Sequence, residues 1–303
     1  MTGLTRRTVL GLLGALSFGL TGSRQARAAT RREALRGVRH WGAQYQEIDL
    51  DAVAASDLDL IVLEPSLDDW YMRFIRPAEV ERLKRKPDGS RRIVLAYLPV
   101  GETDTKRWYW PEAWRKSPPS WVGPENPNWP GSRHVQYWNE AWQDLVFAKP
   151  DSMLDRILEA GYDGALLDRV DAYFDWESNR PSAQDDMIDM VAAIRRKVDA
   201  SRPDFILLPQ NAEPLMLHPR YLQLIDAINK ESLLAGLDGE NRLNKADDVA
   251  WSMDHIRIAE QAGVVIFVTE YATSPELVRR LEQRVAELGF KPFMGVRALD
   301  RLP

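Results

Sequence analysis

Acidic side chains follow several short apolar runs of this chain, and they are the residues best placed to do chemistry. The clearest run, residues 165–167, ends in Asp168, and Asp171 and Tyr173 come soon after it. Buried parallel strands stay apolar until they emerge from the sheet, so a carboxylate at the carboxyl end of such a strand points into the mouth where ligands bind. This segment therefore predicts a ligand-binding site around Asp168.

The same pattern of an apolar run followed by an acid recurs along the chain. Its other members are Glu64, Glu102, Glu213, Glu231 and Glu270, the last with Tyr271 beside it. A solvated loop is the ordinary place for any single acid, but repetition after several strands indicates that these groups converge on one face. Two carboxylates facing a sugar are what glycosidic cleavage requires, one protonated to assist the leaving group and one ionised. Clustered acids raise one another's pKa, which would supply that division of labour.

Eight apolar runs alternate with helical patterns, and this alternation predicts how the acids are positioned. The runs span residues 38–44, 58–64, 92–98, 164–168, 205–210, 224–229, 264–269 and 292–296. Stretches with helical spacing lie between most of them, at residues 77–86, 150–160, 184–200, 245–262 and 275–288, with Gly161 as a helix cap. Eight βα units predict an α/β fold, the (β/α)8 TIM barrel. A doubly wound open sheet is the alternative.

One connection, residues 101–142 after the third predicted strand, is far longer than an ordinary βα loop. It holds seven of the chain's eleven tryptophans and is also rich in proline. Sugars present apolar C–H faces that pack on aromatic rings, so this Trp/Pro-rich loop could form a glycan platform over the barrel mouth. A long loop must also bury something to be ordered, and we expect most of the seven to be structural and roughly one to three to line the cleft.

The amino terminus carries a targeting signal that is not part of the predicted fold. Arg6 and Arg7 lie in a twin-arginine signature, an apolar stretch follows, and residues 26–28 fit the small-x-small pattern before a cleavage site. The apolar stretch is too short to remain as a membrane-spanning helix. We predict a twin-arginine signal peptide at residues 1–28, one domain at residues 29–303, and export to the periplasm or the cell exterior without stable membrane insertion. An ordinary signal peptide is the alternative.

The composition argues against several classes of protein. The formal net charge of −5 becomes −9 without residues 1–28, because that segment holds four arginines and no acid. Nucleic acid is therefore not an expected partner, since its binding depends on phosphate neutralisation. The chain has no cysteine, no nucleophile-elbow, zinc-protease, phosphate-loop or dinucleotide motif, and its four histidines show no ligand spacing. We expect no cofactor, no metal site and a monomer; a cation held by the acid cluster stays open.

Motifs in order along the chain resemble glycoside hydrolase family 114. They are WGAQYQ at residues 41–46, AYLPVGE at 96–102, GALLDRVDAY at 164–173, QNAE at 210–213, KE at 230–231 and GFKPF at 289–293. The resemblance covers nearly all of residues 29–303, and its most specific parts are 97–102 and 168–173. This family comprises endo-α-1,4-polygalactosaminidases with a TIM-barrel fold, so the resemblance implies that residues 29–303 form a glycoside hydrolase domain.

The resemblance implies hydrolysis inside chains of partly de-N-acetylated α-1,4-linked N-acetylgalactosamine, as in some biofilm exopolysaccharides. It implies Asp168 and Glu231 as the catalytic pair, with Asp168 as nucleophile and Glu231 as acid/base in a retaining, endo-acting mechanism. The candidate substrate-binding residues are Tyr97, Glu102, Asp171, Tyr173, Asn211, Glu213, Tyr271, Glu64, Trp41 and Trp108. The expected partner is a cationic aminosugar polymer, whose ammonium groups the additional acids would bind by charge-assisted hydrogen bonds.

The chain departs from the family pattern at a few positions. Glu64 follows the second strand where an aspartate is expected, Pro99 replaces a small polar residue, and Ala212 stands where glycine is expected. These departures bear on the substrate more than on the fold. Two other functions stay open: hydrolysis of a different aminosugar polymer, and non-catalytic polysaccharide binding on a barrel scaffold. The presence of both Asp168 and Glu231 favours an enzyme, because a pure binding protein needs neither.

Overall fold

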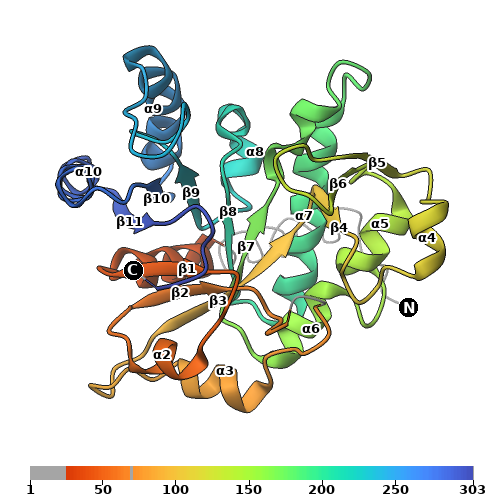
Figure 1. The fold of residues 1–303 in the computed structure, drawn as a ribbon, viewed down its shortest axis with the longest axis horizontal. Coiled ribbons are helices and arrows are strands. Elements are labelled where there is room, and N and C mark those ends of the chain that lie inside the picture. Colours follow the sequence, from red (N-terminus) through yellow and green to blue (C-terminus); the bar gives the residue numbers. More distant parts are fainter. Residues whose placement is uncertain (1–24, 69–70, 303) are drawn as a thin grey trace, which may run out of the picture.

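Eight parallel strands form the centre of the protein in a computed structural model that describes residues 25–68 and 71–302 (Figure 1). The strands are β1 (Trp41–Gln44), β2 (Leu60–Leu63), β3 (Ile93–Pro99), β7 (Gly164–Asp168), β8 (Ile206–Pro209), β9 (Ala227–Glu231), β10 (Val265–Tyr271) and β11 (Lys291–Gly295). They form two parallel sheets with the orders β1-β2-β3-β7-β8 and β11-β10-β9.

The two sheets adjoin at both edges, so the strands form a (β/α)8 barrel. At one edge Gln210, just after β8, bridges to Asn229 of β9 in parallel register. At the other edge β1 lies beside β11, and the Trp41 indole N–H donates to the Lys291 carbonyl at 3.0 Å. The predicted fold class is confirmed. Each predicted apolar run overlaps one strand, and β9 extends beyond its predicted end to include Glu231.

Helices cover the outside of the barrel (Figure 1). They are α2 (Leu50–Ala55), α3 (Pro77–Leu83), α6 (Met153–Ala160), α7 (Ala183–Ser201), α8 (Pro219–Leu222), α9 (Ala246–Gln261) and α10 (Pro275–Glu287). Local sequence sets their ends: α6 begins after Ser152, whose hydroxyl accepts the Asp155 N–H at 3.2 Å. It ends at Gly161, whose φ of 88° is the left-handed cap expected from the sequence. The short α2 and α8 were not predicted.

A further helix, at residues 25–36, is anchored to the barrel by a buried ion network. Asp226, which precedes β9 and is fully buried, accepts from Arg31 of this helix at 2.7 Å and from Arg195 of α7 at 2.6 Å. Residues 1–24 of the predicted signal peptide lie outside the described residues, and residues 25–28 belong to this helix. Export remains a prediction. Among the helices of residues 25–68 and 71–302, none has the length and apolar character needed to cross a membrane.

The long segment after β3 forms a small subdomain at the barrel mouth. It contains β4 (Glu102–Asp104), α4 (Glu112–Lys116), β5 (Val122–Glu125), β6 (Ser132–Val135), α5 (Glu140–Gln143) and the π-helical turn η1 (Asp144–Ala148), and its strands pair antiparallel in the order β4-β6-β5. Four tryptophans, at 110, 114, 121 and 142, pack in series with ring centroids 5.4, 5.5 and 5.6 Å apart. These four are structural, so most of the seven tryptophans in the segment are structural, as expected. Trp129 is 48 % exposed and lines the cleft.

Candidate active site

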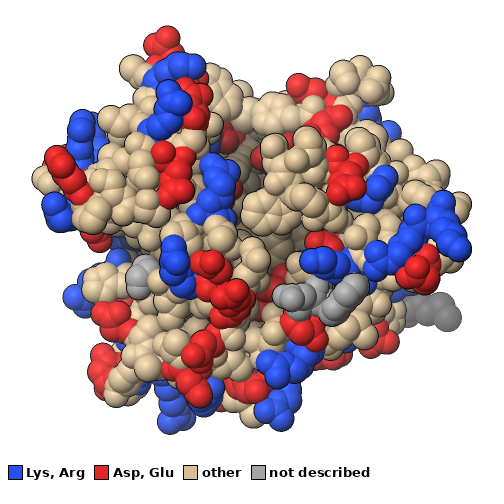
Figure 2. Space-filling model, viewed as in Figure 1, with Lys and Arg blue, Asp and Glu red and all other residues tan. Residues whose placement is uncertain are grey.

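The carboxyl ends of the barrel strands open into a cleft of about 1120 Å³. In Figure 2 the surface is hollowed near its middle, between α9 and the subdomain after β3. The structure brings both predicted catalytic acids and seven of the ten predicted substrate-binding residues to this cleft: Asp168, Glu231, Glu64, Tyr97, Glu102, Asp171, Asn211, Glu213 and Tyr271.

Asp168 is the last residue of β7, and hydrogen bonds hold its carboxylate in place. One oxygen accepts the Tyr97 hydroxyl from β3, and the other accepts the Gln210 side-chain amide at 3.2 Å. Gln210 is itself fixed, because its carbonyl accepts the Asn229 amide at 3.1 Å and Asn229 accepts the Thr269 hydroxyl at 3.0 Å. Four strands thus contribute to the position of a single carboxylate.

Glu231 is the last residue of β9, and hydrogen bonds hold its carboxylate in the same way. One oxygen accepts the Tyr271 hydroxyl, and the other accepts the Asn211 amide at 3.1 Å. The Asn211 carbonyl oxygen in turn accepts the Glu231 backbone N–H at 3.0 Å. Burial raises the pKa of Glu231, the two side-chain hydrogen bonds oppose this rise, and the negative charge of Asp168 adds to it. Glu231 is therefore suited to keep a proton beside Asp168.

Arg169, directly after Asp168, holds three further acids. Its guanidinium lies 3.4 Å from Glu102 and 3.1 Å from Asp171, and it also pairs with Asp175. Burial raises the pKa of Asp171 to about 7 against the opposing charge of Arg169, and Asp168 adds to the rise. Burial likewise raises the pKa of Glu102. Asp175 also contacts His134 at 2.7 Å, so Glu102 and Asp171 are the two acids that share this arginine at the cleft wall, and the wall can accept a cation.

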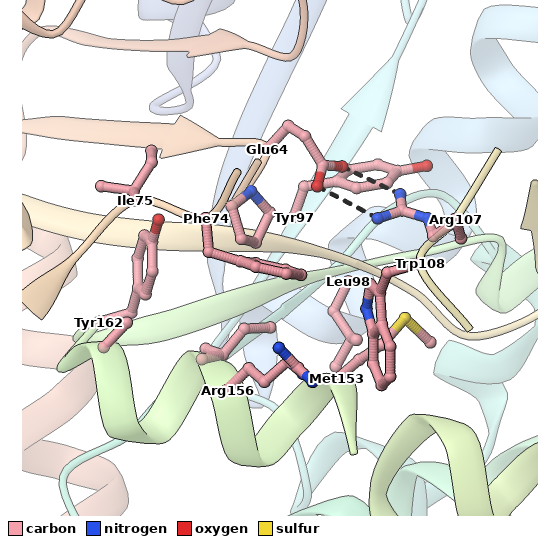
Figure 3. A pocket seen from close by; sticks show the side chains of 13 residues that line it. Glu64, Phe74, Ile75, Tyr97, Leu98, Arg107, Trp108, Met153, Arg156 and Tyr162 are labelled. Atoms are coloured by element: carbon pink, nitrogen blue, oxygen red, sulfur yellow. Dashed lines mark hydrogen bonds and ion pairs between the residues drawn. The ribbon is translucent and has the colours of Figure 1, made fainter. Parts of the chain in front are cut away.

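Two other predicted acids line the cleft but already have a basic partner. Glu64, after β2, makes a two-pronged ion pair with Arg107 at 3.1 and 2.9 Å, which Figure 3 shows. Glu213 lies 2.9 Å from the Lys230 ammonium and accepts the Ser252 hydroxyl at 3.1 Å. These pairs join the elements that form the cleft wall, so Glu64 and Glu213 act chiefly in holding it together.

Three predicted substrate-binding residues lie outside the cleft, and the structure corrects their assignment. Trp41 is 2 % exposed inside the barrel, against two phenylalanine rings with centroids at 5.1 and 5.2 Å. Tyr173 is fully buried in the core. Trp108 lines a separate cavity of about 40 Å³, with the Arg156 guanidinium 3.9 Å from its ring (Figure 3). The sequence does not show which way each of these rings turns.

Sequence reasoning also missed residues that hold the site. Tyr45, just after β1, lines the cleft with its ring centroid 4.6 Å from that of Tyr97. Gln210, just after β8, positions Asp168, and Lys230 pairs with Glu213. A signal was available for the first two, because each is the first polar side chain after its strand.

The backbone turns sharply where strands reach the cleft. Arg169, Asn211 and Ser232 have φ values of 60°, 56° and 51°, in the left-handed region that most L-residues avoid. Ala212 also lies there, at 62°, which explains why glycine was expected at this position. Such backbone strain concentrates at functional sites.

Within residues 25–68 and 71–302, no three histidine or acidic side chains are grouped so as to hold a metal ion.

The sequence matches the family model of glycoside-hydrolase family GH114 over residues 26–302. The chain belongs to this family. It is also 34 % identical over 279 residues to an uncharacterized protein of Deinococcus radiodurans, covering 90 % of this chain and 85 % of that one. An uncharacterized protein of Thermotoga maritima is 32 % identical over 181 residues, covering 58 % and 54 % of the two chains. The resemblance noted in the motifs is thus confirmed.

Among solved structures, the fold is similar to the glycoside hydrolase domain of PelA from Pseudomonas aeruginosa. The TM-score is 0.69 with 23 % sequence identity, covering 88 % of this chain and 98 % of that domain. At this identity the similarity shows a shared fold. Membership of GH114 makes the protein a glycoside hydrolase, as predicted.

Proposed function

We propose that this protein is an exported, endo-acting glycosidase that cleaves α-1,4-linked galactosamine and N-acetylgalactosamine exopolysaccharide with Asp168 and Glu231 as its catalytic pair. The observation that carries the proposal is that these two acids end β7 and β9 and line the same cleft, each held by a tyrosine hydroxyl and a side-chain amide. Hydrogen bonds from Tyr97 and Gln210 orient the Asp168 carboxylate, while burial and the Asp168 charge raise the pKa of Glu231. A glycosidase needs one ionised and one protonated carboxyl group.

In the proposed mechanism, Glu231 donates its proton to the leaving glycosidic oxygen while Asp168 attacks the anomeric carbon. The glycosidic bond breaks and a glycosyl ester forms on Asp168. Glu231, now ionised, takes a proton from the water that hydrolyses this ester, which returns both acids to their starting states. This retaining course requires carboxyl groups ~5–5.5 Å apart, whereas inversion requires ~6.5–9.5 Å.

The Arg169 cluster supports an aminosugar substrate. Glu102 and Asp171 share one arginine at the cleft wall, and burial has raised the pKa of both. An ammonium group of a de-N-acetylated sugar would supply the missing positive charge through charge-assisted hydrogen bonds. The cleft volume of about 1120 Å³ exceeds the ~300–1,000 Å³ typical of a site for one small ligand, which suits several units of a polymer.

The proposed setting is the periplasm or the cell exterior, reached by the twin-arginine route, where the protein would act as a monomer on biofilm exopolysaccharide. It rests on the signal in residues 1–28. Secretion by cells that carry or lack the twin-arginine transporter tests it directly, since export should be lost only without the transporter.

The test of function is mass spectrometry of the products released from a partly deacetylated α-1,4-galactosamine polymer. Wild type should release oligosaccharides, while Asp168→Asn and Glu231→Gln should release none. Glu276→Gln, at an exposed acid of α10 that does not line the cleft, is the control and should resemble wild type. Binding of the polymer by wild type without any product would instead favour the non-catalytic function.

A further inference from the structure

We propose that Trp251 and Asp248 of α9 form an outer subsite of the cleft, which binds a 2-amino sugar unit other than those at Asp168 and Glu231. The inference rests on the proposed polysaccharide substrate and names a site for part of it. Both residues line the cleft with the catalytic acids, but from a helix outside the barrel.

Trp251 is 47 % exposed, although it lies in the middle of a long helix. The core-facing stripe of α9 consists of Ser252, Ile256 and Ala259, which are buried. Trp251 lies beside that stripe and adds little to the core. A large aromatic ring exposed within a cleft offers an apolar face on which a sugar can pack.

The Trp251 ring is held in place before any ligand arrives. The His255 ring lies 4.6 Å from it, centroid to centroid, and the His255 Nδ1 atom is 2.8 Å from the Trp251 carbonyl oxygen. A ring that is already ordered loses little conformational entropy when a ligand packs on it.

The helix that carries this ring is tied to the catalytic strand. Ser252, the next residue of α9, donates to Glu213, and Glu213 pairs with Lys230, the neighbour of Glu231 in β9. This chain of contacts fixes α9 relative to the catalytic acid. A sugar bound at Trp251 would therefore bear a constant relation to the bond being cleaved.

Asp248 supplies the polar half of the subsite. It lies one helical turn before Trp251, so the two side chains are neighbours on the helix surface. Its carboxylate is exposed, and no ion pair joins it to any residue within 25–68 and 71–302. An indole face packs on the apolar C–H face of a sugar, and a carboxylate beside it binds an ammonium group. Together they fit a 2-amino sugar.

Other exposed aromatic rings line the same cleft from different elements. Trp129 belongs to the subdomain after β3 and Phe174 to the turn η2 (Val170–Asp175), and each is 48 % exposed. In Figure 1 the subdomain and α9 lie on different sides of the barrel. A polymer chain that crosses the catalytic acids could therefore meet a ring on each side.

The test measures both binding and cleavage. Calorimetry measures binding of the polymer to the inactive Asp168→Asn variant. Adding Trp251→Ala to this variant should weaken binding roughly tenfold, which corresponds to about 1.4 kcal/mol. Trp251→Phe should restore most of the affinity. Leu243→Ala is the control, since Leu243 is 49 % exposed and does not line the cleft.

Cleavage then shows where the subsite lies. Trp251→Ala should lower kcat/KM most for long substrates, and the loss should shrink as the oligosaccharide is shortened. Asp248→Asn should weaken binding of deacetylated polymer but not of fully N-acetylated polymer. Unchanged affinity in Trp251→Ala, or an equal loss of kcat/KM at every chain length, would overturn the inference. Absence of cleavage by wild type would contradict the proposed function instead, and the binding measurement would still decide the subsite.

Discussion

Removing the Tyr271 hydroxyl should raise the pKa of Glu231 and move the pH profile of the enzyme. In the structure this hydroxyl donates to one Glu231 oxygen and so favours the ionised carboxylate. A hydrogen bond to a charged group contributes ~1.5–3 kcal/mol, and one pKa unit corresponds to about 1.36 kcal/mol. Tyr271→Phe should therefore raise the pKa of Glu231 further.

The sign of the effect on activity follows from the proposed role of Glu231 as the acid. Activity requires Glu231 to be protonated, so the alkaline limb of kcat/KM reports its pKa in the free enzyme. In Tyr271→Phe that limb should move to higher pH, even where the maximal rate falls.

The assay is kcat/KM for polymer cleavage across about pH 4 to 10. Tyr45→Phe is the matched control, because Tyr45 also lines the cleft and, within the part of the chain described here, makes no hydrogen bond to Glu231. Its alkaline limb should coincide with that of wild type. An alkaline limb that stays in place or moves to lower pH in Tyr271→Phe would refute the assignment of Glu231 as the acid.

Three predictions concern the scaffold. In Gly101→Ala the new Cβ would lie 2.2 Å from the Arg169 carbonyl oxygen, so urea unfolding should show a loss of ~1–3 kcal/mol and polymer cleavage should slow. Asp226→Asn leaves two buried arginines short of their counter-charge and should lower the free energy of unfolding by ~3–5 kcal/mol in the same assay. Burial raises the pKa of Glu270 from its ordinary 4.5 to about 7, so the native state holds this proton more tightly than the unfolded chain does. The free energy of unfolding should therefore fall by about 3 kcal/mol as the pH rises from about 4.5 to 7. Glu270→Gln should reduce this dependence of the free energy of unfolding on pH.

The barrel could be predicted because its strands are short, apolar and bounded by polar residues. The pattern failed in the subdomain after β3, where β5 contains Gly123 and Pro124 and is partly exposed. Such a strand has neither a continuous apolar run nor a clear alternation, so only its pairing with β6 identifies it.

The positions of the acids could be predicted from the same strand ends, but their partners could not. Arg169, Arg107 and Lys230 neutralise acids from other elements, and only the closed barrel brings these charges together. The orientations of the aromatic side chains were harder still to predict. All of β1 is buried, so its sequence does not distinguish a ring inside the barrel, as for Trp41, from one that faces the mouth.

The most direct test of the central claim uses a galactosaminyl fluoride and the Glu231→Gln variant. Fluoride leaves without a proton from the enzyme, so Asp168 can still be glycosylated while the missing base slows hydrolysis of the ester. Intact-protein mass spectrometry should show one added sugar, and peptide mapping should place it on Asp168. A sugar on another residue, or turnover to an inverted product with no adduct, would contradict the assignment of Asp168 as nucleophile and Glu231 as acid/base.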